Sequence, residues 1–95
     1  MTLLETTYKS LHDCDLTKST RDFSTKYLNR NANWYSYQTH KKRDFSVSTA
    51  FNFITYINAH ISNESYDIKT VLLLNNLKNC VEKFLQEKHA VMLNH

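Results

Sequence analysis

The chain has no glycine and no proline among its 95 residues. These residues serve most tight hairpin turns, and glycine also builds phosphate-binding loops and left-handed helix caps. Their absence disfavours a β-rich fold and a glycine-rich nucleotide loop. Helices can be joined without them, because asparagine tolerates the left-handed conformation and short polar side chains cap helix N-termini. The ten asparagines fit that use, although an AT-rich genome would produce the same excess.

Cysteine is scarce, and long apolar runs are missing. Cys14 and Cys80 lie far apart and form neither a CxxC pair nor a cysteine and histidine cluster with metal-ligand spacing. The longest apolar run, 71–74, has four residues, whereas a membrane-spanning helix needs about 18. No signal peptide is recognisable. We therefore expect a cytoplasmic protein with reduced thiols and no membrane span.

Residue groupings typical of catalysis are also missing. His12 and Cys14 form only a local pair, and there is no recognisable catalytic triad, carboxylate pair or cofactor loop. The other histidines form no metal-binding pattern; they are His40, His60, His89 and His95. We predict that the protein is not an enzyme and has no metal or cofactor.

The charge that is present is unevenly placed. Residues 18–43 carry seven basic residues and one acidic residue, a net charge of +6. The remainder has five basic and eight acidic residues, a net charge of −3. A positive middle segment in a chain of net charge +3 suits contact with phosphates.

Apolar spacing and capping residues predict an all-α protein, a compact four- to five-helix domain covering 1–95. Thr2 and Glu5 have capping-box spacing, Asn29 suits a left-handed turn, and Asp67 suits the N-terminus of a long last helix. The predicted helices are 2–12, one from Thr17 or Ser19 to Leu28, 32–42 after Asn31, one from Ser46 or Ser48 to Ile61, and 66–92.

The two C-terminal helices carry the strongest apolar patterns. In the fourth helix the predicted inner stripe is Val47, Ala50, Phe51, Ile54, Ile57 and Ile61, widened by Phe53 and Tyr56. The last helix has a heptad seam that predicts a homodimer contact; its dimerisation residues are Leu74, Leu77, Val81, Phe84, Leu85 and Val91. An intramolecular helical hairpin is the alternative for the same pattern.

The segment 17–61 resembles a helix-turn-helix of the lambda-repressor-like kind, as found in small DNA-binding proteins of bacterial and phage mobile elements. Ser24 matches the small residue at the crossing of the two helices, and Phe23, Leu28 and Tyr35 match buried positions. The sequence departs from the motif in having Asn29 where glycine is usual. The distance from Ser24 to Tyr35 is also one residue longer than in the commonest form.

This resemblance implies that helix 32–42 enters the major groove, where asparagine and glutamine can pair with adenine. The side chains nearest the bases would be Asn33, Tyr37 and Gln38, with Asn31 and Trp34 beside them. Phosphate contacts would come from Arg21, Lys26, Arg30, Lys41, Lys42 and Arg43. Without the motif, the basic run 41–43 would be read as a solvated helix end.

The favoured hypothesis is a homodimeric transcriptional repressor that binds double-stranded DNA. The alternative is a protein-interaction module or inhibitor whose aromatic and basic helix binds a protein partner. In that case the aromatic residues of helix 32–42 would be the anchors, namely Trp34, Tyr35 and Tyr37.

Overall fold

The computed structural model describes residues 1–63 and 66–90, and this part of the chain forms helices and loops without a strand. The elements are α1 (Leu3–Asp13), α2 (Thr20–Asp22), η1 (Phe23–Tyr27), α3 (Trp34–His40), α4 (Val47–Asn63) and α5 (Ile68–His89). The π-helical segment η1 continues α2 without a break, so the two act as one helical element. The all-α prediction and the long C-terminal helix are confirmed.

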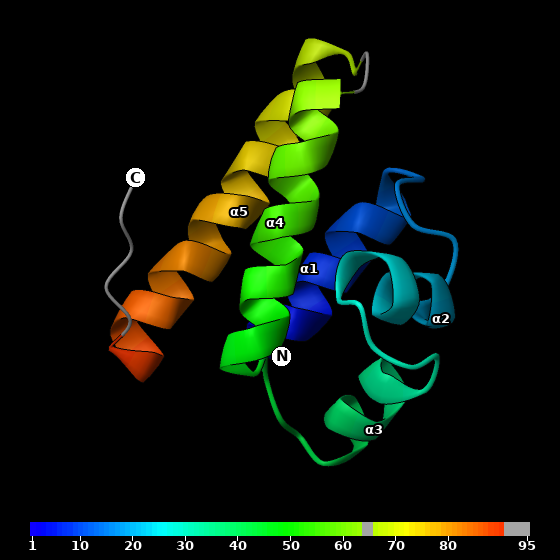
Figure 1. Ribbon diagram of the computed structural model, residues 1–95. Coiled ribbons are helices and arrows are strands. Elements are labelled where there is room, and N and C mark those ends of the chain that lie inside the picture. The colour runs from blue at the N-terminus through cyan, green and yellow to red at the C-terminus, as the bar shows by residue number, and fades with distance from the viewer. Residues whose placement is uncertain (64–65, 91–95) are drawn as a thin grey trace.

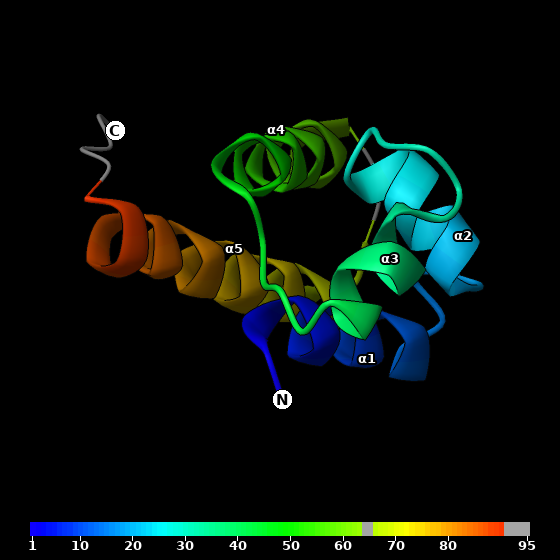
Figure 2. The same cartoon turned by 90° about the horizontal axis from the view of Figure 1, so that it is seen from below.

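α4 and α5 form an antiparallel hairpin, and the other helices lie on one side of it (Figures 1 and 2). The radius of gyration is 12.7 Å, close to the value of about 12 Å expected for a compact chain of this length. α5 is therefore packed along the body rather than projecting from it.

The hydrophobic core contains residues from α1, η1, α4 and α5, and side chains of α3 pack against it. Its aromatic centre is Phe23, whose ring lies 5.6 Å from Tyr8 and 6.5 Å from Phe53, centroid to centroid. Such tilted and edge-to-face ring pairs contribute stabilisation beyond their buried area. The buried aliphatic side chains around it are Leu4, Leu11, Leu28, Ile57, Leu74, Leu77, Val81 and Leu85.

Side-chain caps begin α1, α2 and α5, whereas α3 has none. Thr2 and Glu5 form the predicted capping box, and the Asp67 carboxylate accepts the Thr70 N–H at 2.9 Å. The Ser19 hydroxyl accepts the Asp22 N–H at 3.1 Å, which selects Ser19 over Thr17 as the cap of α2. Each of these bonds satisfies an N–H that the helix itself leaves without a partner.

The predicted bounds of two helices need correction. α3 begins at Trp34 rather than Ala32, because the Asn31 side chain accepts the Asn33 N–H at 3.0 Å and forms a turn there. α3 ends at His40 and α5 at His89, both earlier than expected. Residues 91 and 92, assigned to the last helix, lie outside the described residues.

The inner stripe of α4 is also rotated relative to the prediction. Ala50, Phe53 and Ile57 are fully buried, whereas Val47 and Phe51 are 37% and 41% exposed. Phe53 lies one turn from the buried Ala50 and Ile57, whereas Phe51 lies one turn from Val47 and Ile54, which the sequence also placed in the inner stripe but which are exposed and half-buried. The packing of η1 against α4 places Phe53 inward beside Phe23 and Tyr27.

Candidate nucleic-acid interface

η1 and α3 are joined at a small buried residue. Ser24 is completely buried, and its hydroxyl accepts the Tyr35 N–H, in the first turn of α3, at 3.0 Å. A larger side chain would separate the two helices and leave that N–H without this partner. Ser24 thus holds the place that the sequence assigned to it, and Phe23 and Leu28 are buried beside it as predicted.

Tyr35 anchors the inner side of α3. Its ring lies 4.9 Å from that of Tyr8 and 5.8 Å from that of Phe23. Burial of the phenol raises the pKa of Tyr35 to about 12, with smaller contributions from Glu5 and Tyr8. The side chain is uncharged over the physiological pH range and packs half-buried against the core, so the burial expected at this position is only partial.

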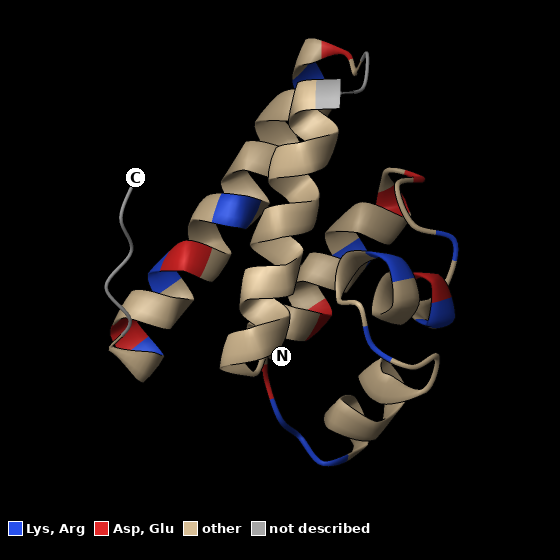
Figure 3. Cartoon of the chain, in the orientation of Figure 1, with Lys and Arg blue, Asp and Glu red and all other residues tan. Residues whose placement is uncertain are grey.

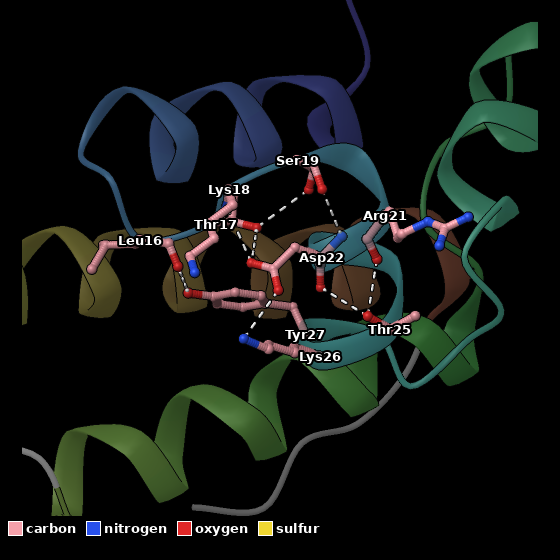
Figure 4. A network of polar contacts seen from close by, with 9 residues as sticks. All are labelled: Leu16, Thr17, Lys18, Ser19, Arg21, Asp22, Thr25, Lys26 and Tyr27. Atoms are coloured by element: carbon pink, nitrogen blue, oxygen red, sulfur yellow. Dashed lines mark hydrogen bonds and ion pairs between the residues drawn. The ribbon is translucent and has the colours of Figure 1, made fainter.

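A polar network around Asp22 holds the start of the α2–η1 element (Figure 4). The Asp22 carboxylate accepts the Thr17 hydroxyl at 3.0 Å and the Lys18 N–H at 3.1 Å, and it pairs with Lys26 at 3.1 Å. Burial alone would raise the pKa of Asp22, but these hydrogen bonds and the Lys26 charge outweigh it and lower the pKa below 3.8. The carboxylate is charged and fully engaged at neutral pH.

Two residues expected to contact DNA face inward instead. Gln38 is only 8% exposed, and its side-chain amide donates to the Asp44 carbonyl at 3.1 Å. Trp34 packs against the hydrophobic core. Gln38 therefore holds the loop after α3 and is not placed to read a base edge, whereas Trp34 remains half-buried on the same inner side of the helix.

The exposed face of α3 is made by Asn33, Ser36, Tyr37 and His40, which are all exposed. These positions follow the i, i+3, i+4, i+7 spacing of one helix face. The Tyr37 side chain is 54% exposed. Ser36 and His40 were not among the predicted DNA contacts, although both share the helix face of Asn33, on the side opposite the inward-facing Gln38.

Cations flank this face at both ends. Arg30 lies in the loop before α3, and Lys41, Lys42 and Arg43 follow it; all four are exposed (Figure 3). The Arg30 guanidinium donates to the Ser48 hydroxyl, and the Lys41 ammonium lies 5.8 Å from the Tyr37 ring centroid. No acidic residue occurs in 23–43. The exposed face of α3 therefore lies in a positively charged segment that contains no carboxylate side chain.

The remaining predicted phosphate contacts belong to the α2–η1 element. The Lys26 ammonium is paired with Asp22, so much of its charge is balanced within the protein. Arg21 is exposed and extends toward the side of the molecule where α3 lies (Figure 4). Asn31 is exposed in the loop before α3, where its side chain closes the turn to Asn33.

The predicted dimer seam is part of the core of a single chain. Leu74, Leu77, Val81 and Leu85 are between 0% and 7% exposed and pack within the monomer. Phe84 is half-buried, with its ring 6.3 Å from that of Phe45. The assignment of these side chains to a dimer contact is corrected accordingly, because the α4–α5 hairpin already uses them. Val91 lies outside the described residues.

Other kinds of site find little support in the described part of the chain. Cys14 and Cys80 are exposed free thiols. Among the described residues, no group of three histidine, cysteine or acidic side chains is placed to hold a metal ion. No described helix has the length and apolar character needed to cross a membrane.

Comparison with known proteins places the chain in a family without assigning an activity. No curated protein and no solved structure matches it. One family model, described as a family of unknown function (DUF6626), matches residues 4–92. That match spans all the helices described above, including α3 and the α4–α5 hairpin. The chain therefore belongs to this family of unknown function, DUF6626.

Proposed function

We propose that the protein binds double-stranded DNA with α3 in the major groove. The observation that carries the proposal is the exposed face of α3, which has no acidic residue and lies between Arg30 and the run 41–43. An α-helix fits the major groove of B-DNA, and flanking lysine and arginine side chains contact phosphates in such complexes.

Within this proposal the four side chains of this exposed face approach the base edges. Asn33 precedes the helix and is able to pair bidentately with adenine, while Ser36 offers a hydroxyl and His40 an imidazole. Tyr37 adds a phenol and an apolar ring. Arg30, Lys41, Lys42 and Arg43 set the position on the duplex, and Ser24 holds the angle of α3 through Tyr35.

The proposed role is transcriptional regulation, by repression, at an operator of a mobile element. Two copies of the chain would read half-sites about one helical turn apart, as in other helix-turn-helix proteins. Because the apolar seam of α5 is buried in the monomer, we propose that two copies meet on DNA rather than through that seam.

A protein partner is less well supported by the same surface. Trp34 and Tyr35 were its expected anchors, yet both pack against the hydrophobic core. Tyr37 is the remaining exposed aromatic side chain of α3. Interface hot spots depend on clustered anchors that become fully desolvated, and one exposed tyrosine among cations is a weak basis for one.

Fluorescence anisotropy with a labelled random-sequence duplex tests DNA binding at a series of salt concentrations. We expect salt-sensitive binding, because each neutralised phosphate contributes about 0.9 to the slope of log K against log salt. Arg30→Gln and Lys41→Gln should each reduce that slope by about 0.9. Lys83→Gln is the matched control, because Lys83 is an exposed lysine of α5 whose ammonium lies 3.8 Å from Glu87.

The outcomes separate the hypotheses. Equal slopes for all three variants would reject the proposed face even if the protein binds DNA. Absence of binding at low salt, with circular dichroism confirming folded protein, would reject DNA binding and favour a protein partner. After an operator has been selected, Asn33→Ala should relax its base preference, with a cost of about 1–3 kcal/mol on the preferred duplex.

A further inference from the structure

A groove of 640 Å³ lies between the inner side of α3, the loop after it and the C-terminal end of α5. Its volume falls within the range of about 300–1,000 Å³ typical of small-molecule sites. Three aromatic and three basic side chains line it, namely Trp34, Phe45 and Phe84 with Arg43, Lys88 and His89. The DNA-binding proposal uses only Arg43 of these residues.

The aromatic side chains come from three separate segments. Trp34 belongs to α3, Phe45 to the loop before α4, and Phe84 to α5. The Phe84 ring lies 6.3 Å from that of Phe45 and 5.3 Å from the His89 imidazole. Trp34 and Phe84 are only half-buried, so both can contact a ligand in the groove. Such a surface favours an apolar, aromatic body.

The charges at the groove favour an anion. Arg43 and Lys88 are exposed cations, and His89 adds an exposed imidazole. Asp44 is the one carboxylate among the residues that line the groove. Its oxygens accept the N–H groups of Leu3 and Leu4 at 2.9 and 2.8 Å. The Asp44 charge is thus compensated by the N-terminus of α1.

We propose that this groove binds a small carboxylate with an aromatic body. The aromatic body packs among Trp34, Phe45 and Phe84, and the carboxylate lies toward Lys88 and Arg43. Because Trp34 and Gln38 belong to α3, such a ligand would also contact the helix assigned to DNA. Any effect on DNA affinity depends on the proposed function, whereas binding of the carboxylate does not.

Trp34 is the single tryptophan of the chain and therefore reports on the groove by its fluorescence. The probe is 4-phenylbutyrate, and its uncharged counterpart is 4-phenylbutanamide, which has the same apolar body. The titration is made without DNA. A ligand of this size is expected to bind with a Kd of about 0.1–1 mM. We expect saturable quenching by the carboxylate and binding of the amide about tenfold weaker.

Two variants assign the binding to the groove. Lys88→Gln should weaken 4-phenylbutyrate about threefold or more and leave the amide unchanged, while the control Lys83→Gln should change neither. Phe84→Ala should weaken both ligands, with circular dichroism used to confirm its fold. No saturable response, equal affinity for acid and amide, or an unchanged Kd in Lys88→Gln would each overturn the proposal. All of these results are obtained without DNA, so they stand apart from the test of the proposed function.

Discussion

At the scale of single residues, four residues adopt the left-handed backbone conformation that glycine often adopts. Asp15, Asn29, Lys42 and Ala90 have positive φ angles of 53–59°. Asn29 was predicted, because asparagine tolerates this conformation. Lys42 and Ala90 were not predictable from their side chains, since each takes the conformation from its place at a helix end. After α3, the Arg43 N–H donates to the Gln38 carbonyl at 2.9 Å, which compensates the cost at Lys42.

The carboxylate of Asp22 gives a prediction at this scale. Asp22→Asn should lower the free energy of unfolding by about 1–2 kcal/mol at neutral pH, because charge-assisted hydrogen bonds and the Lys26 pair are lost. The pKa of Asp22 is below 3.8 in the folded state. Its stabilisation is therefore present above pH 3.8 and is lost as the pH falls through the lowered folded-state value. Urea unfolding of both proteins at several pH values measures this difference.

Asp15→Asn is the matched control for that experiment. Asp15 is exposed and has a positive φ angle that asparagine adopts readily. Its free energy of unfolding should remain close to that of the wild type across the same pH range. The assigned role of the carboxylate would be contradicted if the free energies of unfolding of wild type and Asp22→Asn differed by the same amount at every pH, including the most acidic.

At the scale of the elements, the apolar heptad residues of α5 are covered within the α4–α5 hairpin. Heptad spacing predicts an apolar helix face but not which surface covers it. Here α4 and the rest of the core cover Leu74, Leu77, Val81 and Leu85. The exposed apolar residues of α5 are Ile68 and Leu72, near its beginning. The intramolecular hairpin, which was the alternative at the sequence level, is the arrangement that forms.

Truncation of one buried and one exposed leucine of α5 tests this use of the helix. Leu85→Ala should lower the free energy of unfolding by about 2–5 kcal/mol, because Leu85 is fully buried. Leu72→Ala should change it by less than about 0.5 kcal/mol, because Leu72 is 57% exposed. Urea unfolding at several protein concentrations gives both values. If the stability of the wild type rose with concentration, the seam would be an intermolecular contact after all.

At the scale of the whole molecule, basic residues gather around α3. Figure 3 shows basic residues around both ends of α3, whereas α5 carries basic and acidic residues together. Of the seven basic residues in 18–43, four lie at the two ends of α3, namely Arg30, Lys41, Lys42 and Arg43. An approaching polyanion would orient the molecule with α3 toward it.

Sedimentation velocity gives the prediction for the whole molecule. The free protein should sediment as a monomer, because its longest apolar seam is already buried in its own core. With a selected operator duplex, two copies should bind one DNA molecule. A dimer in the absence of DNA would contradict this prediction and would require another interface, whereas a single copy on the full operator would contradict only the paired half-sites.

The sequence alone determined the helical fold, the capped ends of α1 and α5, and the basic character of the middle segment. These features depend on local spacing, on side chains next to the backbone groups that they cap, and on a count of charges. The direction of particular side chains depended on neighbours distant in the chain. Tyr35 is held by Ser24 and Tyr8, Gln38 by Asp44, and Phe53 rather than Phe51 faces the core because η1 packs there. Only the tertiary structure decided which face of α3 is exposed. The helix carries aromatic and polar side chains on several sides, and the contacts with distant residues determine which of these sides is covered.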